Sequence, residues 1–525
     1  MNYNQRISLS VIVFLLIIYL SNANAQVTIG SHYTPKSGAL LDLKESTAVG
    51  ENSKKGLLLP RVLLEGKLKL EPTVQTSDAN KESHIGLTVY HTGSEELCEG
   101  VYTWNGTQWN KLGSPCGLTV DPALLYGPNC YIVNPGESQI IPAAKAYLAW
   151  DTRPDLTSLS LSDKVSADLL WQDTQGLITS VGLENGSDKN QYSNLKVVTT
   201  SGKTGNAVVA VRIGPNGNTS DPICWSWHIW VTTYNPDAPT GSDKVYMHNN
   251  GEADYTFMDR NLGALTTSDS DINSMGLLYE WGRKDPFTSG TQFGYSTPPR
   301  TLYDINNNTL IEMDELQSGY NPANHNGFKH QQVPDGIASM LDKSIQNPMI
   351  YYYGTKSLTD WYTSLNNTGD PNLWGATDGK SIFDPCPAGW RVPTLSSPSS
   401  LSPWAKFDSS SSGGWDDGSP ADFDTTSNGI YMKTSSYDLG FYPYMANRIP
   451  YTIYSGNVGS STPFIGGLFP SLTLNNGNGV YWIANSSATA GKAKLLVFYH
   501  PGMMPMLETE DAERAVGAAV RCVKE

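Results

Sequence analysis

The stretch from Asp384 to Thr394 reads DPCPAGWRVPT and places one cysteine between two prolines, close to a glycine, a tryptophan and an arginine. Proline restricts φ and lacks a backbone N–H donor, so the segment favours a rigid loop over a helix or a paired strand. Cys386 could serve as a nucleophile, as a metal ligand or as half of a disulfide. None of the cysteines forms a CxxC motif or a Cys/His cluster, which argues against a zinc site.

The chain contains six cysteines, an even number that allows complete pairing in an oxidising compartment. Six cysteines permit about 15 connectivities. Their spacing favours a sequential pairing, because each pair would then lie inside one predicted domain. The pairs of that scheme are Cys98 with Cys116, Cys130 with Cys224, and Cys386 with Cys522.

Further motifs accompany DPCPAGWRVPT along residues 242–525. They are YTFMDRNLGA (255–264), GLLYEWGRKDPF (276–287), Tyr481-Trp482 ahead of Asn485-Ser486-Ser487, and Gly517 ahead of AVRCV (519–523). Together these segments resemble the Fibrobacter succinogenes major paralogous domain, which carries such motifs in the same order. One departure follows Thr394, where the family has a TxxEW helix start. Here the chain continues LSSPSSLSPW, so the helix is delayed or shortened and its capping carboxylate is absent.

This resemblance implies an α+β domain similar to the C-type-lectin-like and formylglycine-generating folds. It implies that Cys386 and Cys522 tie a mid-domain loop to the last strand. We expect Arg260 and Arg391 to form buried hydrogen bonds with loop carbonyls or carboxylates, because a planar guanidinium serves several acceptors at once. Structural roles are expected for the motif side chains, which are Arg260, Trp281, Trp390, Arg391, Trp482 and Arg521.

The WGRKDPF segment (281–287) offers three adjacent charged side chains, Arg283, Lys284 and Asp285. They could bind an acidic ligand. The aromatic and aliphatic residues around them instead favour a short helix that packs on the sheet.

Residues 118–240 contain short β-patterned runs separated by turn sequences such as PGE, NGSD and PNGN. This spacing predicts an immunoglobulin-like, all-β sandwich, with YLAW (147–150) as one of its strands. In ICWSWHIWVTTY (223–234) we expect Trp225, Trp227, Ile229 and Val231 to face the core, because alternate side chains of a strand share a face. His228 could be a ligand, but a lone strand histidine favours a hydrogen-bonded or surface position.

Residues 26–117 form a leader module that ends in a predicted β-hairpin. Two alternating runs flank Asn105-Gly106, the strongest two-residue turn signal. That turn would place Trp104 opposite Thr107 and Tyr102 opposite Trp109. Its stretches TIG, ALLDL and KGLLLPRV resemble a leader common in exported proteins of the Bacteroidetes type, which implies export and no specific activity.

Residues 1–25 have the features of a signal peptide. Arg6 precedes the apolar run VIVFLLIIYL (11–20), and Ala23-Asn24-Ala25 gives the small-x-small pattern of a cleavage site. The run is too short to span a bilayer, and no later stretch approaches the roughly 20 apolar residues of a membrane helix. The sequence therefore predicts export to the outer-membrane surface or beyond, with no transmembrane segment.

The acidic charge balance argues against nucleic acid as a partner. The net charge is −15, with 35 basic and 50 acidic residues. A nucleic-acid groove needs clustered Lys and Arg to replace counterions, so nucleic acid is not an expected partner.

Recognised catalytic motifs do not occur in the sequence, which lacks HExxH, GxSxG and a P-loop. The formylglycine-generating relatives hold copper with two thiols, whereas the two cysteines of residues 242–525 are better explained as one bridge. We therefore predict a non-enzymatic protein without a cofactor.

One segment has the spacing of a calcium loop. Oxygen-bearing side chains occupy positions 1, 3, 5, 9 and 12 of an EF-hand-like pattern, from residue 304 to residue 315. Thr309 stands where that loop wants glycine, so an Asn-rich surface turn is the alternative. The candidate calcium ligands are Asp304, Asn306, Asn308, Glu312 and Glu315.

These features predict an exported, multidomain surface protein for adhesion or ligand capture, with carbohydrate or protein ligands bound by loops of residues 242–525. Aromatic faces and amide groups suit such ligands. Two alternatives stay open: a structural or tip subunit of a surface filament, with assembly partners at the surface, and a carbohydrate-active enzyme.

Overall fold

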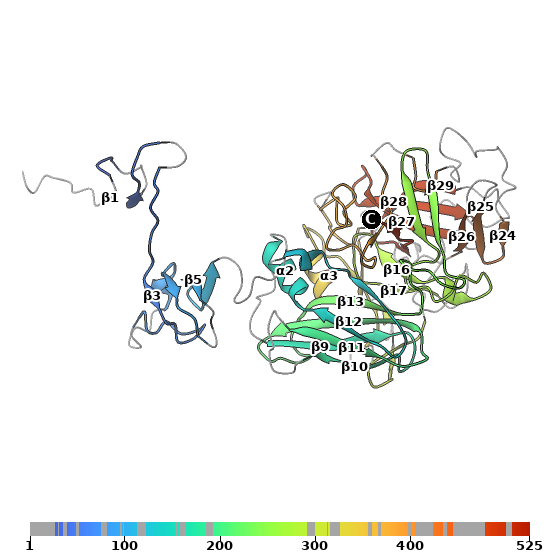
Figure 1. Cartoon of the computed structure of the whole chain (residues 1–525), viewed down its shortest axis with the longest axis horizontal. Coiled ribbons are helices and arrows are strands. Elements are labelled where there is room, and N and C mark those ends of the chain that lie inside the picture. Colours follow the sequence, from blue (N-terminus) through green and yellow to red (C-terminus); the bar gives the residue numbers. More distant parts are fainter. Residues whose placement is uncertain are drawn as a thin grey trace, which may run out of the picture. The chain divides into compact units, whose positions relative to one another are not determined.

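The computed structural model divides the chain into two compact units, unit 1 (Met1–Thr119) and unit 2 (Val120–Glu525), both drawn in Figure 1. The predicted signal peptide lies outside the described residues. The structure describes residues 27–29, 31–34, 39–48, 52–74, 81–94, 97, 99–112, 122–153, 156, 164–184, 193–290, 300–311, 313–314, 326–354, 360–365, 369–396, 401–405, 424–433, 438–444, 478–499 and 507–525.

Unit 1 contains two small sheets. A parallel pair joins β1 (Val27–Ile29) to β2 (Leu41–Leu43). A four-stranded sheet has the order β3-β4-β5-β6. Its strands are β3 (Arg61–Val62), β4 (Thr88–His91), β5 (Gly100–Trp104) and β6 (Trp109–Leu112). The four-stranded sheet has a core of its own, built from Leu64, Leu70, Val89, Leu97, Tyr102, Trp104 and Trp109.

The predicted hairpin is formed by β5 and β6, but its predicted register is wrong. Trp104 pairs with Trp109, and Tyr102 pairs with Lys111. The loop therefore spans residues 105–108 and not a two-residue turn. Its geometry is set by Asn105, whose Oδ1 accepts the backbone N–H groups of Thr107 and Gln108 at 3.0 and 2.8 Å. The aromatic pair that results is edge-to-face, with ring centroids 5.5 Å apart.

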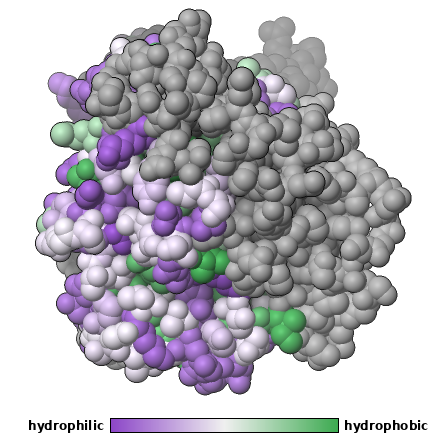
Figure 2. Space-filling view, turned by 90° about the vertical axis from the view of Figure 1, so that its right-hand side faces the viewer, coloured by the Kyte–Doolittle hydropathy of each residue, from purple (hydrophilic) through white to green (hydrophobic). Residues whose placement is uncertain are grey.

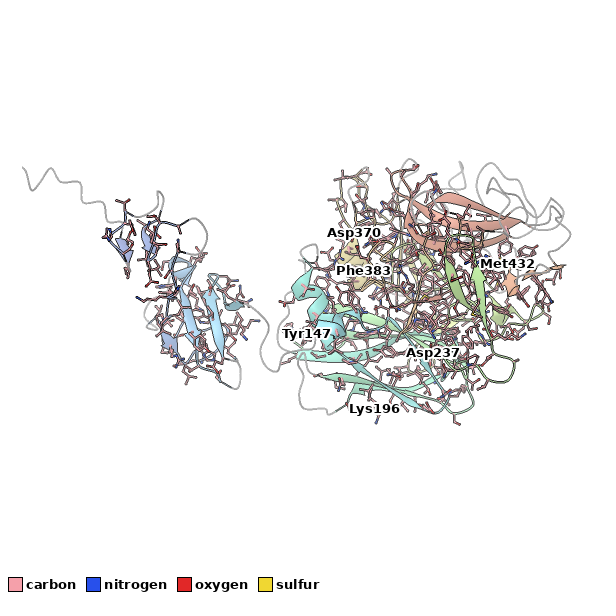
Figure 3. All side chains as sticks on the ribbon, turned by 45° about the horizontal axis from the view of Figure 1, so that its top comes forward. Tyr147, Lys196, Asp237, Asp370, Phe383 and Met432 are labelled. Atoms are coloured by element: carbon pink, nitrogen blue, oxygen red, sulfur yellow. A yellow bond between two sulfur atoms is a disulfide. The ribbon has the colours of Figure 1, made fainter. Side chains whose placement is uncertain are left out.

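The first part of unit 2 consists of two sheets. The larger has the order β19-β18-β9-β12-β13-β7, and the smaller has the order β10-β11-β8. The strands of residues 130–231 are β7 (Cys130–Val133), β8 (Ser138–Pro142), β9 (Lys164–Gln172), β10 (Ile178–Leu183), β11 (Asn194–Thr199), β12 (Gly205–Gly214) and β13 (Ile223–Val231). β11 alternates as a half-buried strand should, with Leu195 and Val197 buried and Lys196 exposed on the outer face (Figure 3).

One predicted strand of this region is a helix. YLAW lies within α2 (Ala144–Thr152), which follows β8. The local sequence AKAYLAWDT is rich in alanine, the residue of highest helix propensity, and four apolar residues in a row carry no period that separates strand from helix. α2 buries Tyr147 and Trp150, and the Trp150 Nε1–H donates to the Cys224 carbonyl at 2.7 Å.

Strand β13 is buried along its whole length, beyond the four side chains expected to face the core. Its second face is covered by residues that follow position 242: Ser226 contacts Lys284 and Asp285. Strands β18 (Leu302–Tyr303) and β19 (Thr309–Leu310) also extend the larger sheet beyond β9. The two regions predicted as separate domains thus share one compact unit and one large apolar core.

The rest of unit 2 is also mostly β, with α3 (Leu341–Gln346) as the α-helix among its described residues. A four-stranded sheet has the order β14-β15-β31-β23, and a six-stranded sheet has the order β17-β16-β30-β27-β28-β29. The strands of these two sheets are β14 (Val245–Asn249), β15 (Asp254–Met258), β31 (Val523–Lys524), β23 (Trp390–Arg391), β17 (Phe287–Thr288), β16 (Leu277–Glu280), β30 (Gly517–Ala519), β27 (Asn478–Ser486), β28 (Lys492–Tyr499) and β29 (Leu507–Glu513).

Two further sheets of three strands complete unit 2 in the described ranges, with the orders β20-β21-β22 and β24-β25-β26. Their strands are β20 (Met313–Asp314), β21 (Lys329–Gln332), β22 (Ile350–Tyr353), β24 (Asp424–Thr426), β25 (Gly429–Lys433) and β26 (Asp438–Pro443). The helix predicted at WGRKDPF is wrong. The segment joins β16 to β17, which pair antiparallel through Leu277–Thr288 and Leu278–Phe287.

Within the part of the chain that is described, no helix has the length and apolarity needed to cross a bilayer.

Candidate functional site

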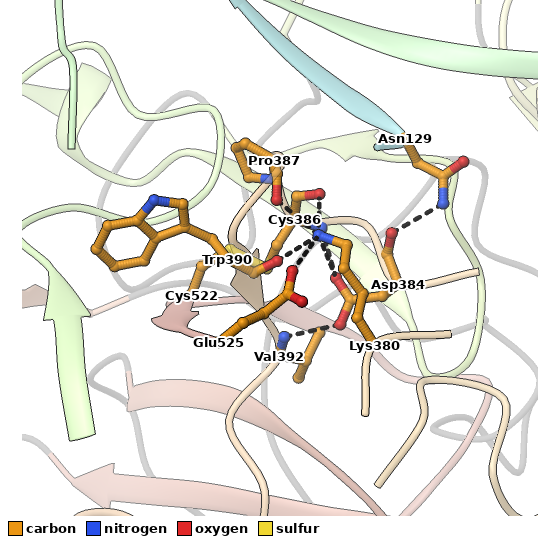
Figure 4. The surroundings of a disulfide bond; sticks show 9 residues. All are labelled: Asn129, Lys380, Asp384, Cys386, Pro387, Trp390, Val392, Cys522 and Glu525. Atoms are coloured by element: carbon orange, nitrogen blue, oxygen red, sulfur yellow. Dashed lines mark hydrogen bonds and ion pairs between the residues drawn. A yellow bond between two sulfur atoms is a disulfide. The ribbon is translucent and has the colours of Figure 1, made fainter. Parts of the chain in front are cut away.

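The DPCPAGWRVPT loop closes unit 2 through the predicted disulfide between Cys386 and Cys522, which is confirmed with an S–S distance of 2.04 Å. Strand β23 of this loop pairs antiparallel with β31 next to the bridge. The Asp384 carboxylate accepts the backbone N–H groups of Cys386 and Val392, both at 2.8 Å. These contacts hold the loop on both sides of its cysteine (Figure 4).

A buried lysine fills the inside of the same loop. Lys380 Nζ donates to the carbonyls of Cys386 and Pro387 at 2.8 and 2.6 Å, and also to the Trp390 carbonyl. Burial lowers the pKa of Lys380, while the nearby Asp384 carboxylate at 3.6 Å opposes that shift. Cys386 thus has a structural role. The neighbouring Lys380 and Asp384 side chains hydrogen-bond to the carbonyl and N–H groups of the loop, which has few backbone hydrogen bonds of regular secondary structure.

The other motif side chains also hold the fold. Arg260 pairs with the carboxylates of Asp259 and Asp243 at 2.7 and 2.6 Å. Arg391 donates to the Gly375 carbonyl at 2.6 Å. Arg521 donates to Asn261 Oδ1 at 2.9 Å and to the Phe441 carbonyl at 2.9 Å. The indole N–H groups of Trp281, Trp390 and Trp482 donate to Ile483 O, Asp237 Oδ1 and Tyr279 O.

The predicted Cys130–Cys224 disulfide is wrong, since both cysteines are free and buried. The parallel register of β7 and β13 places Cys130 opposite His228, so Cys224 lies four residues before the paired position on β13. At about 3.3 Å per residue this is roughly 13 Å, beyond the reach of a disulfide. Burial raises the pKa of both thiols. The predicted Cys98–Cys116 pair lies outside the described residues.

The charged residues of WGRKDPF form a buried cluster that the sequence did not predict. Lys284 Nζ contacts the Asp285 carboxylate at 2.8 Å and also Ser226 of β13. Burial lowers the pKa of Lys284. Adjacent serine and lysine side chains can form a nucleophile and its base. Lys284 and Asp285 are 2 and 3 % exposed and Ser226 is 0 % exposed, so this arrangement fastens β13 to the loop and offers no open reaction site.

His228 is also internal. Its Nε2 lies 3.0 Å from Asn206 Oδ1, and burial lowers the pKa of the imidazole to about 3. The neutral ring therefore donates one hydrogen bond within the core.

The candidate calcium loop is in part a hairpin turn between β18 and β19. Asp304 Oδ1 accepts the backbone N–H groups of Asn306 and Asn308, both at 2.8 Å. Asp304 Oδ2 accepts the side-chain amide of Asn308 at 2.9 Å. These contacts are those of the Asn-rich surface turn. Glu312 and Glu315 lie outside the described residues, and no cluster of three or more His, Cys, Asp or Glu suited to a metal occurs among those described.

A different kind of site lies in unit 1, where large apolar side chains face solvent. Among the described residues, eleven of the sixteen exposed large hydrophobic side chains belong to unit 1. They are Ile29, Tyr33, Leu40, Leu41, Leu43, Leu57, Leu58, Leu63, Leu68, Ile85 and Leu112. In contrast, the coloured face of unit 2 in Figure 2 is mostly hydrophilic or neutral, with separate hydrophobic spots. Exposed apolar side chains mark an interaction site in a soluble protein where they gather into one patch.

Considered as sequence alone, the stretches ALLDL (39–43) and KGLLLPRV (55–62) indicate only a leader. Their repeated leucines were the available signal. The exposure of these leucines could not be predicted, because an apolar run in a small β module is compatible both with burial in its own core and with exposure to a partner.

Unit 1 is similar to a known protein family. A family model described as "Phage tail like trimerisation region" matches residues 28–123, which is most of unit 1. No curated protein and no solved structure matches the chain.

Proposed function

We propose that this chain is an exported surface protein that forms a trimer through unit 1 and presents unit 2 for adhesion or ligand capture. The observation that carries this proposal is the concentration of exposed apolar side chains in the region that resembles a trimerisation region. Burial of apolar surface drives most protein association. Three copies would also present three binding surfaces, which raises avidity without any new contact.

For unit 2, we propose that residues 118–240 are an immunoglobulin-like sandwich and that residues 242–525 are a Fibrobacter succinogenes major paralogous domain in a lectin-like fold. The buried motif side chains and the Cys386–Cys522 bridge support a scaffold role for these sequence motifs. Ligands would then contact the loops around this scaffold, with carbohydrate or protein as the ligand class.

The resemblance to a trimerisation region also favours the structural alternative, in which the trimer is a subunit or tip of a surface filament. In that case the assembly would continue beyond three copies. The enzyme alternative has less support, because the one serine–lysine pair described above is buried and fastened to a carboxylate.

The test is the mass in solution of the chain from residue 26 to residue 525, measured by light scattering after size exclusion. We expect three copies per particle. A monomer would overturn the trimer, and particles that grow with concentration would favour the filament subunit. When the same preparation is applied to glycan and peptide arrays, we expect the protein to bind to some of the immobilised glycans or peptides. Turnover of a chromogenic glycoside without array binding would favour the enzyme.

A further inference from the structure

The parallel pair β1–β2 is an incomplete structure as it stands. Its two strands pair only with each other among the described residues, so each keeps one open edge. Parallel sheets are almost always covered on both faces, and even an antiparallel two-stranded ribbon is marginally stable alone in water. The pair therefore needs additional contacts.

One face of the pair is apolar and uncovered. Ile29 lies opposite Leu43 in the register, and Leu41 shares the face of Leu43 because side chains alternate along a strand. These three side chains are 57, 37 and 50 % exposed, respectively. They form what we call the ribbon face.

The other side of the pair carries the charges. Lys44 is only 4 % exposed, and its Nζ contacts Asp42 Oδ2 at 2.6 Å and the Thr34 carbonyl at 2.7 Å. The chain thus covers a lysine and leaves leucines in water, which reverses the usual distribution in a soluble domain. Such an arrangement is favourable when another apolar surface covers the ribbon face.

The four-stranded sheet of unit 1 differs in this respect. Its large side chains Tyr102, Trp104 and Trp109 are 2, 0 and 1 % exposed. The indole N–H groups of Trp104 and Trp109 donate to the carbonyls of Lys81 and Lys69 at 3.0 and 2.7 Å. This sheet therefore has an apolar core within one chain, whereas the ribbon has none; the exposed Leu63, Leu68, Ile85 and Leu112 lie outside that core.

We propose that the ribbon face of Ile29, Leu41 and Leu43 is the contact core of the assembly, where it packs against the same face of two further copies. The inference rests on the proposed trimer and goes beyond it, because it assigns the contact to the ribbon and not to the β3–β6 sheet. A threefold axis brings three equal faces together and closes the contact, so that no face is left in water.

The test compares charge substitutions at matched exposed leucines. In the chain of residues 26–525, Leu41→Asp places a carboxylate on the ribbon face, and Leu112→Asp places one on β6, where Leu112 is 56 % exposed. We expect Leu41→Asp to reduce the particle mass in light scattering threefold at concentrations where the unsubstituted chain is a trimer. Leu112→Asp should keep the trimer. A trimeric Leu41→Asp variant, or a monomeric Leu112→Asp variant, would overturn the assignment.

A cross-linking variant tests the same contact without a buried charge. In Leu43→Cys, three thiols would meet around the axis, and mild oxidation should give a covalent dimer on a non-reducing gel. Leu112→Cys and the unsubstituted chain should give none above their shared background. A trimer in which Leu43→Cys does not cross-link would refute the ribbon contact and leave the trimer intact. A monomeric unsubstituted chain would refute both.

Discussion

Unit 1 and unit 2 both enclose an ion pair, but they differ in where their large apolar side chains lie. In unit 2 some ion pairs are internal, such as Arg514 with Asp360 at 2.5 Å, both 2 % exposed at the side chain. In unit 1 the leucines of the β1–β2 ribbon face solvent while Lys44 is covered. A region that covers its own large apolar side chains is complete as one chain. A region that exposes its leucines has more apolar surface than its own core can cover, and this difference is the basis of the proposed assembly.

The largest expected effect is the loss of stability of unit 2 when its Cys386–Cys522 disulfide is removed. Cys386 and Cys522 are 136 residues apart. In the chain-entropy model, closing such a loop stabilises the folded state by about 5 kcal/mol. The double variant Cys386→Ser/Cys522→Ser should lower the free energy of unfolding of unit 2 by that order and leave unit 1 unchanged. Hydrogen exchange measured at increasing denaturant concentration gives the free energy of unfolding of each unit separately. An equal decrease in both units would contradict the proposed difference between them.

A substitution in unit 1 gives the reciprocal test. Trp109→Ala removes a fully buried ring from the core of the β3–β6 sheet. Replacing a buried tryptophan with alanine costs about 3–5 kcal/mol. We expect faster exchange of the β5 and β6 amides and no change in unit 2. If the Trp109→Ala variant is still a trimer, the assembly contact does not depend on an intact β3–β6 sheet.

A pH test addresses the internal polar groups of unit 2. Burial holds the pKa of His228 at about 3, so the folded state keeps a neutral ring. The unfolded chain takes up a proton as the pH falls below about 6.5, and the free energy of unfolding therefore decreases from there towards pH 3, by about 2 kcal/mol at pH 5. Above that window the group contributes no pH dependence.

The matched variant is His228→Gln, whose amide can still donate to Asn206 Oδ1. Urea denaturation at pH 7 and pH 5 should show a smaller loss of stability in the variant than in the unsubstituted chain. The same loss in both would mean that His228 does not titrate as its burial implies.

The smallest effect concerns the surface of unit 2. Asp304→Ala removes the carboxylate that accepts two backbone N–H groups in the β18–β19 turn. We expect a loss of about 1 kcal/mol, the usual value of one net hydrogen bond, and the same melting temperature with calcium as with chelator. A rise in melting temperature with calcium that Asp304→Ala abolishes would instead establish the calcium loop.

Local rules predicted the elements that depend on local chemistry. The hairpin and the β-rich character of residues 130–231 were predictable in this way, whereas the Cys386–Cys522 bridge was predicted from cysteine spacing and the family resemblance. The hairpin register was not, because one side-chain oxygen of Asn105 replaces the expected two-residue turn. The helix containing YLAW was missed because four apolar residues fit either secondary structure.

Apart from the Cys386–Cys522 bridge, properties that depend on contacts between distant parts of the chain could not be predicted. The Cys130–Cys224 pair failed because its geometry depends on the register of β7 against β13, and these strands are almost a hundred residues apart in the chain. The burial of Lys284 and Asp285 depends on Ser226 of another strand. Exposure of the ribbon leucines is visible only when the rest of unit 1 is seen not to cover them.

The two buried thiols bear on the order of events during biosynthesis. Cys386 must wait for Cys522 before its bridge can close, and any accessible thiol competes during that interval by disulfide exchange. Cys130 and Cys224 lie in β7 and β13, strands that leave the ribosome before Cys386 does. Once this sheet forms, both thiols are withdrawn from oxidants. In the folded protein, burial of Cys130 and Cys224 therefore keeps both thiols from exchanging with the Cys386–Cys522 bridge.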